Sequence, residues 1–297
     1  MYEKFYGFSE KPFNMTPDTK FFYPSPKHEE AQNCIIFAIS QKSGFVVITG
    51  EIGSGKTTVC RTLVNKLDIT TKVAMIFNTY LGRKDLLTAI LEDLGIEYKS
   101  TSKTHLLSAL NKYLVKQAED GIDVILIIDE AQNLTSSVIE EIRMLSNFET
   151  ETEKLIQIVL VGQPELRQKL LLPKLEQFRQ RVLLQYHIEP LSYAETRGYI
   201  KYRLLKVGSP YGEIFTREAI DEIYKYSKGV PRLINLVCNH ALINGVVYDK
   251  RKIDVEIARE AVRELLRNTG MDSLNIKQDI IVSPQPTAHS PQFVQET

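Results

Sequence analysis

Residues 46–63 read VVITGEIGSGKTTVCRTL, an apolar run followed by a glycine-rich turn and a segment with helical character. Gly50, Gly55, Lys56 and Thr57 have the spacing G-x-x-x-x-G-K-T, which is typical of a phosphate-binding loop between a strand and a helix. A chance match in a glycine-rich turn is the alternative, and the strand-like and helix-like flanks disfavour it. The sequence therefore predicts a P-loop.

The residue types in this loop predict a nucleoside triphosphate as its ligand. Glycines let backbone N–H groups turn toward phosphate oxygens, and the N-terminus of the following helix adds a positive dipole. Lys56 is expected to reach the β- and γ-phosphates, and Thr57 is expected to bind Mg²⁺, so ATP and Mg²⁺ are the expected cofactors. The predicted cofactor-binding residues are Gly50, Glu51, Ile52, Gly53, Ser54, Gly55, Lys56, Thr57 and Thr58.

A second motif is the apolar run Val124–Ile128, which is followed directly by Asp129 and Glu130. Successive apolar residues of this kind are typical of a strand that is buried on both faces. At its end, Asp129 is expected to hold Mg²⁺ beside the Thr57 hydroxyl, and Glu130 to orient or deprotonate the attacking water. A solvated strand end is the alternative, and the P-loop disfavours it.

Apolar, β-branched runs alternate with amphipathic stretches up to Ile188, which predicts an α/β fold with a parallel sheet and helices on both faces. The expected strands are Phe45–Thr49, Lys72–Phe77, Val124–Asp129, Leu155–Val161 and Val182–Ile188. The expected helices between them are Lys56–Leu67, Lys84–Leu94, Thr104–Glu119 and Ser136–Asn147.

Strand signals stop after Ile188, and a small all-helical lid domain is expected to follow. A capping box from Ser192 to Glu195 opens its first helix. The further expected helices are Thr216–Tyr226, Pro231–Val247 and Asp254–Arg267. The predicted domains are an aromatic N-terminal strap over residues 1–30, an α/β nucleotide-binding domain over 31–190, the lid over 191–268 and a disordered tail over 269–297.

The N-terminal strap carries eight tyrosine and phenylalanine residues between Tyr2 and Tyr23. Aromatic side chains bury a large apolar area, so hydrophobic anchoring of the strap is the expected role.

Composition excludes several classes of protein. The chain has 37 basic and 37 acidic residues, so no overall field draws it to nucleic acid or anionic lipid, and contact with DNA would be local. Three cysteines without a C-x-x-C pair argue against a disulfide framework or zinc site, and the five histidines show no metal spacing and are expected to be structural. No apolar run reaches about 18 residues and the N-terminus lacks a signal-peptide core, so a cytoplasmic protein without a membrane span is expected.

The motifs together resemble those of the AAA+ ATPases and, within them, the ExeA/GspA-like group, which is related to transposition ATPases of the TnsC and MuB kind. The resemblance covers residues 1–268. It rests on the segments FYGFSEKPFNMTPDTKFFYPSPKHEEA, GEIGSGKTT, LIIDEAQNL, VLVGQPEL, LEQFRQRV and GVPRLINLVCNHAL. In the family the N-terminal segment packs over the nucleotide side of the core.

The resemblance implies three further catalytic residues. Gln163 matches the sensor 1 position, whose polar side chain contacts the γ-phosphate or the water. Arg232 matches the sensor 2 arginine, which reaches the phosphates from the lid. Arg181 corresponds to the arginine finger that enters a neighbouring subunit's site, with Arg179 as the fallback, and this implies a homo-oligomer. Each residue also has a purely structural alternative. Gln163 would be a turn residue, Arg232 an exposed arginine in a first helical turn, and Arg181 with Arg179 a basic helix end.

The resemblance also implies a function: an ATPase that couples turnover to assembly or remodelling of a secretion or pilus-type system, with a protein of that system as partner. The alternative is an ATP-dependent DNA-binding regulator of transposition, with a transposase as partner. Residues 191–268 carry 14 Lys and Arg against 10 Asp and Glu, a surplus too common to decide for DNA. A nucleotide-controlled switch with slow hydrolysis is a third reading, and Glu130 argues for a hydrolytic cycle.

Overall fold

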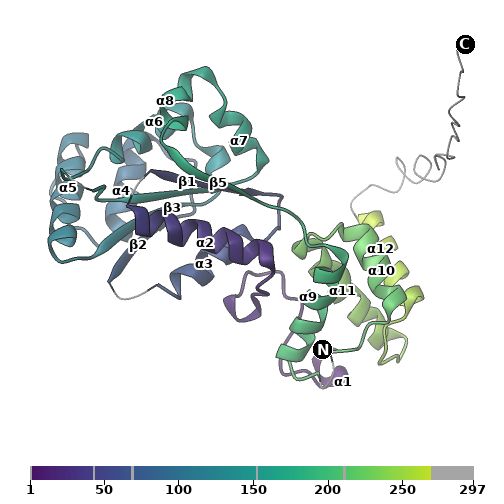
Figure 1. The fold of residues 1–297 in the computed structure, drawn as a ribbon. Coiled ribbons are helices and arrows are strands. Elements are labelled where there is room, and N and C mark those ends of the chain that lie inside the picture. Colours follow the sequence, from purple (N-terminus) through teal and green to yellow (C-terminus); the bar gives the residue numbers. More distant parts are fainter. Residues whose placement is uncertain (1, 43, 68–69, 152, 210–211, 269–297) are drawn as a thin grey trace, which may run out of the picture.

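The computed structural model describes residues 2–42, 44–67, 70–151, 153–209 and 212–268, so the predicted tail lies outside the described residues. Figure 1 shows an α/β domain joined to a helical domain by the chain that leaves strand β5 (Val182–Ile188). The helical domain lies beyond the carboxyl end of that strand. None of the described helices is long and apolar enough to cross a membrane.

The α/β domain is built on a sheet of parallel strands in the order β2-β3-β4-β1-β5. The strands other than β5 are β1 (Phe45–Gly50), β2 (Thr71–Ile76), β3 (Asp123–Ile128) and β4 (Gln157–Gly162). The predicted α/β class and parallel sheet are therefore confirmed, with small displacements at the strand ends. Since all strands run the same way, the residues that follow them meet at one edge of the sheet.

Side chains alternate between the two faces of the sheet because successive residues of a strand point in opposite directions. Val46 and Ile48 pack under α2 (Pro26–Gln41) and α3 (Lys56–Val64). Phe45 and Val47 face the opposite helical layer. That layer consists of α4 (Arg83–Asp93), α5 (Lys103–Glu119), α6 (Ser136–Leu145), α7 (Pro164–Leu170) and α8 (Glu176–Arg179). Both faces are covered, which accounts for the unbroken apolar runs.

Among the helices that were not expected from the sequence are α2 and α7. Each begins with a proline, Pro26 or Pro164, at its first position. A proline there fits the helical backbone and loses no hydrogen bond, because the first N–H groups of a helix have no partner within it. The prolines and the polar residues around these two helix starts resemble a turn, so the sequence pattern did not indicate a helix there.

The predicted lid is a helical domain. It contains α9 (Tyr193–Lys206), α10 (Arg217–Ser227), α11 (Pro231–Val247) and α12 (Val255–Asn268). The capping box at Ser192 forms as expected, since its hydroxyl accepts from the Glu195 N–H at 3.3 Å and the Glu195 carboxylate accepts from the Ser192 N–H at 2.7 Å.

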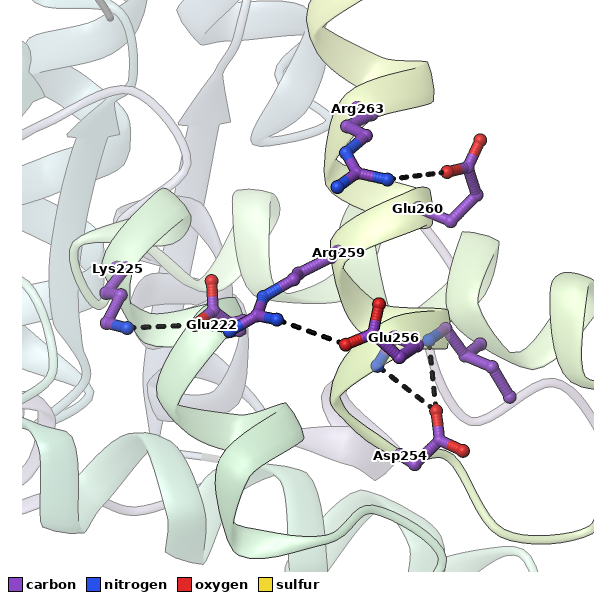
Figure 2. A network of polar contacts seen from close by, with 8 residues as sticks. Glu222, Lys225, Asp254, Glu256, Arg259, Glu260 and Arg263 are labelled. Carbon is purple, nitrogen blue, oxygen red and sulfur yellow. Dashed lines mark hydrogen bonds and ion pairs between the residues drawn. The ribbon is translucent and has the colours of Figure 1, made fainter.

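An ion pair joins the outer sides of α10 and α12, and further pairs lie within each helix (Figure 2). Glu222 of α10 pairs with Lys225 at 2.8 Å and with Arg259 of α12 at 3.5 Å. Arg259 also pairs with Glu256, and Arg263 pairs with Glu260. Pairs this exposed contribute roughly 0–1 kcal/mol each, so the apolar contact between the helices supplies most of the stability of this packing.

The N-terminal strap is part of the core of the lid. Tyr2, Phe8, Phe13 and Phe21 are buried in one cluster with the helices of the lid. The Tyr2 hydroxyl donates to Asn239 Oδ1 at 2.9 Å. Anchoring by aromatic side chains is therefore what the structure shows, and the surface they anchor to is the lid.

Candidate nucleotide-binding site

A cavity of about 420 Å³ lies where the P-loop, the strap and the lid meet. Its lining includes Lys56 from the P-loop, Phe22 and Tyr23 from the strap, and Tyr199 and Arg232 from the lid. The cavity follows the carboxyl end of β1, where open α/β sheets bind their ligands.

Glycine is required at the turns of the P-loop. Gly53 and Gly55 have φ of 80° and 95°, in the left-handed region that side chains disfavour. At Gly50, a Cβ would lie 2.7 Å from Ser54 Oγ. The loop can therefore curl tightly before α3 begins at Lys56 and leaves the first N–H groups of that helix without intrahelical partners.

Lys56 is a buried cation, 5% exposed, whose ammonium donates to the carbonyls of Gly50 at 2.8 Å and Glu51 at 2.9 Å. Burial lowers the pKa of Lys56, while the charges of Glu130 and Asp129 oppose that shift. None of its bonds in the described chain goes directly to a carboxylate. A buried ammonium next to free N–H groups fits a phosphate chain. Of the other predicted loop residues, Thr58 lines the cavity, Glu51 and Ile52 are exposed, and the buried Ser54 Oγ has no hydrogen-bond partner among the described residues.

Thr57 and Asp129 form the predicted metal-binding pair. Thr57 Oγ1 donates to Asp129 Oδ2 at 2.5 Å, and Asp129 Oδ1 accepts from the Glu130 N–H at 2.8 Å. Burial raises the pKa of Asp129, and the hydrogen bond from Thr57 opposes the rise. A hydroxyl and one carboxylate are hard oxygen ligands that suit Mg²⁺, which also takes phosphate oxygens and water. The donor set therefore fits Mg²⁺, whose role would be to neutralise phosphate charge.

Glu130 lies in the left-handed region, with φ of 51°, and it lines the cavity. Its backbone carbonyl accepts from Thr79 Oγ1 at 3.0 Å. Its carboxylate Oε2 accepts from Gln163 Nε2 at 3.2 Å. Non-glycine residues in this region carry backbone strain of about 1–3 kcal/mol and are found most often at functional sites. The structure thus brings Gln163 to Glu130.

Arg232 brings the lid to the P-loop. Its N–H, in the first turn of α11, donates to the Gly53 carbonyl at 3.2 Å. A Cβ at Gly53 would lie only 2.4 Å from the Arg232 Cβ. Arg232 also lines the cavity, so the two domains meet at the loop that is expected to hold phosphate.

Arg181 lies away from the cavity of its own chain. Its carbonyl accepts from the N–H of Phe45, so it is at the amino end of β1, whereas the P-loop follows the carboxyl end. Its guanidinium donates to Ser146 Oγ at 2.9 Å and Asn147 Oδ1 at 2.5 Å, at the end of α6. Arg179 donates to carbonyls at the end of α7. Both arginines are bound to helix ends, and neither lines the cavity.

His28 is a functional candidate that the sequence analysis assigned to structure alone. Its Nε2 lies 2.9 Å from the Ser54 carbonyl and its Nδ1 lies 2.6 Å from Ser25 Oγ. Burial lowers the pKa of His28, which favours a neutral ring that donates from Nε2 to the P-loop and accepts at Nδ1 from the serine. No local motif predicts the contact of His28 with the P-loop, because Ser25 and His28 are far from the P-loop in sequence.

A polar group on the lid side of the cavity was also missed. Arg203 is 6% exposed and donates to the Pro12 carbonyl at 2.5 Å and to the Tyr199 hydroxyl at 2.8 Å. The Tyr199 hydroxyl in turn donates to Asn235 Oδ1 at 2.8 Å. In the sequence Tyr199 and Arg203 lie one helical turn apart and Asn235 lies in a separate helix, so no local motif joins the three residues.

Comparison with known proteins agrees with this geometry. A family described as "AAA domain" matches residues 39–170. General secretion pathway protein A of Aeromonas hydrophila is 39% identical over 262 residues, which are 87% of this chain and 48% of that protein. An uncharacterized HTH-type transcriptional regulator of Methanocaldococcus jannaschii is 27% identical over 55% of this chain and 41% of its own length. The chain thus spans about half the length of the curated relatives it matches.

Solved structures share the fold at low sequence identity. The Aeropyrum pernix ORC2 protein in its ADP form has a TM-score of 0.66 at 16% identity, over 86% of this chain and 73% of that chain. The Thermotoga maritima RuvB Holliday junction branch migration motor has a TM-score of 0.57 at 18% identity, over 85% and 73%. With the P-loop, the acidic strand end and the helical lid in place, the chain carries an AAA domain over residues 39–170 and is a homologue of general secretion pathway protein A.

Proposed function

We propose that the protein binds ATP with Mg²⁺ in this cavity and hydrolyses it. The observation that carries the proposal is the meeting of Lys56, the Thr57–Asp129 pair and Glu130 around one cavity. Lys56 would neutralise ground-state phosphate charge, and Glu130 would act on the water as the γ-phosphoryl leaves. Gln163 would hold the Glu130 carboxylate and contact the γ-phosphate or the water.

This division of roles is tested by two variants. Lys56→Ala should lose ATP binding, whereas Glu130→Gln should bind ATP normally and lose turnover. Fluorescent-nucleotide titration and phosphate release measure the two quantities separately. Hydrolysis at the parent rate by the Glu130→Gln protein would overturn the assignment of the catalytic carboxylate.

We further propose that hydrolysis requires assembly, with Arg181 of one subunit acting in the site of its neighbour. Arg181 and the P-loop lie at opposite ends of β1, five residue steps of about 3.3 Å apart, so the side chain does not serve its own site. A planar guanidinium suits the charge that develops on the transferring phosphoryl group. In this proposal, Arg181 leaves the end of α6 when a neighbour's nucleotide offers a stronger anionic partner.

Mixing two inactive variants tests the finger. Arg181→Ala subunits retain a P-loop and Lys56→Ala subunits retain a finger, so a mixed assembly should recover turnover that neither variant shows alone. Arg181→Ala by itself should lose about a thousandfold in rate. A mixture that stays inactive, with mixed assembly confirmed by cross-linking, would exclude Arg181, and the same mixture with Arg179→Ala would follow.

For the pathway, we propose that turnover drives assembly or remodelling of a secretion or pilus-type system. The support is the 39% identity to general secretion pathway protein A, whose name places that protein in the general secretion pathway. We also propose the cytoplasmic location that the sequence predicts. DNA is the competing partner, and similar folds include a Drosophila ORC bound to DNA. DNA binding that weakens steeply with salt and requires a non-hydrolysable ATP analogue would favour the transposition role instead.

A further inference from the structure

The carboxylate of Glu130 is held through one of its two oxygens by two side-chain amides. Gln132 Nε2 donates to Glu130 Oε2 at 2.6 Å, and Gln163 Nε2 donates to the same atom at 3.2 Å. In the part of the chain that the structure describes, Oε1 receives no hydrogen bond. One oxygen is thus engaged by the protein, and the other keeps its lone pairs available beside the cavity.

The amide of Gln132 fits its surroundings in one orientation only. Its Oε1 accepts from the backbone N–H of Gln163 at 3.0 Å, while its Nε2 donates to Glu130. Turning the amide over would set its oxygen against the carboxylate and its NH₂ against the N–H, and both contacts would be repulsive. Gln132 therefore links Glu130, which lies beyond the end of β3, to Gln163, which follows β4, with defined donor and acceptor roles.

Three neighbouring features fix the position of Gln132. It lies on the short 3-10 helix η2 (Ala131–Asn133). Lys169 of α7 donates to the backbone carbonyls of Gln132 and Leu134, the latter at 2.8 Å. Gly162, the last residue of β4, leaves room for the amide, since a Cβ there would lie 2.9 Å from Gln132 Oε1. The side chain is thereby held from its backbone as well as from its amide.

We infer that Gln132 is a positioning residue for catalysis: its amide fixes the rotamer of the Glu130 carboxylate so that Oε1 faces the attacking water. The inference rests on the proposed function, in which Glu130 acts on water. A charge-assisted hydrogen bond at this distance is among the stronger side-chain contacts. Without it, Glu130 Oε2 keeps only the longer hydrogen bond from Gln163, and the side chain regains rotamers in which neither oxygen is aligned. Misplacement of a catalytic group by about 1 Å costs on the order of 100-fold in rate.

The test separates turnover from nucleotide binding. Gln132→Met keeps the length of the side chain and removes the amide. It should lower kcat by about 10- to 100-fold while the dissociation constant for ATP stays within about twofold of the parent. The matched control is Gln168→Met on α7, whose side chain is exposed, and it should keep the parent kcat. Gln132→Glu, equal in size but without a donor, should lose turnover at least as strongly and still bind ATP.

A double variant shows whether Gln132 acts through Glu130. In the Glu130→Gln background, adding Gln132→Met should leave the residual rate unchanged, because the carboxylate that Gln132 positions is gone. A further drop there, or a parental kcat in the folded Gln132→Met or Gln132→Glu protein, would overturn the inference alone. A parent protein without turnover would overturn the proposed function together with the inference, so the two failures are distinguishable.

Discussion

Asp129 is a buried carboxyl group whose ionisation costs stability. It is 3% exposed, and burial raises its pKa. An acid whose folded pKa exceeds its unfolded value binds protons more tightly when folded, so it costs stability as the pH rises above that unfolded value. At neutral pH the folded protein bears this cost, which a bound cation would offset.

We therefore predict that Asp129→Asn raises the melting temperature of the nucleotide-free protein at pH 7. The same variant should lose the stabilisation by Mg²⁺ and ATP, which amounts to about 2.7 kcal/mol for the parent at 100 times the dissociation constant. Differential scanning fluorimetry with and without Mg²⁺ and ATP measures both effects. A variant that melts lower than the parent without ligand, yet gains as much from Mg²⁺ and ATP, would contradict this role.

The lowered pKa of His28 predicts how the free energy of unfolding depends on pH. Burial lowers its pKa in the folded state, so the unfolded chain binds more protons than the folded chain between the folded pKa and the unfolded value of about 6.5. The free energy of unfolding should therefore fall as the pH drops from 7 through this window. Glu195 opposes this shift and Lys27 adds to it.

His28→Gln keeps hydrogen-bonding capacity without this titration, so its unfolding free energy should depend less on pH between 7 and 5 than that of the parent. Urea unfolding at each pH measures the difference. The exposed His105, replaced in the same way, is the control and should retain the parent's pH dependence. Equal slopes for the parent and the His28→Gln protein would show that other groups carry the dependence.

At the scale of the elements, the alternation of buried runs and amphipathic segments was enough to predict the sheet. β1 and β3 are so apolar because both of their faces are covered, and their unbroken apolar runs indicated this burial. The helices α2 and α7 were missed because each begins at a proline in a turn-like context. The contact of the strap with the lid was missed because it joins residues such as Tyr2 and Asn239, which are far apart in the sequence.

Within the site, the sequence predicted residues that belong to local motifs and missed those that act from a distance. Asp129 and Glu130 come directly after β3, and Lys56 follows β1 through the P-loop, so the strand order brings them to one edge. His28 reaches the P-loop from α2, and Gln132, although only two residues from Glu130, is bonded to Gln163 after β4; no spacing encodes these two pairings. Arg181 was assigned from resemblance, and its contacts with α6 could not be inferred from the segment that carries it.

The strap is predicted to stabilise the lid as a core element would. Phe13 is 1% exposed and meets the Phe215 ring edge-on, with 6.0 Å between centroids. Phe13→Ala should lower the free energy of unfolding of the lid by about 3–5 kcal/mol. Hydrogen exchange of α9 and α11 amides measures this loss locally. Tyr80→Ala is the control, since Tyr80 is 83% exposed and its loss should cost no more than about 0.5 kcal/mol. Unchanged exchange in the Phe13→Ala lid would contradict this role.

For the whole molecule, the meeting of Arg232 and Gly53 gives the lid a direct contact with the loop that is proposed to hold phosphate. The strap extends this coupling, because it is buried in the lid and also lines the cavity. Nucleotide in the cavity would thus touch both domains at once, and the position of the lid should follow the state of the nucleotide.

Arg232→Ala should weaken the ATP-dependent movement of the lid more than it weakens ADP binding, because its guanidinium is the proposed contact of the lid with the phosphates. Small-angle scattering with ADP and with a non-hydrolysable ATP analogue reports the movement, and fluorescence titration reports the binding. Arg217→Ala, an exposed arginine at the start of α10, is the control. An Arg232→Ala protein that compacts with the ATP analogue as the parent does would remove this role.

The central claim, that Glu130 turns over ATP held by this P-loop, is tested most directly by a single-turnover measurement. Protein in excess over radiolabelled ATP is mixed with Mg²⁺, quenched at intervals and analysed for ATP and ADP. The parent should convert its bound ATP to ADP in one exponential phase, while Glu130→Gln, bound to the same extent, should retain intact ATP over many parental half-times. Equal rates of conversion in the two proteins would contradict the account.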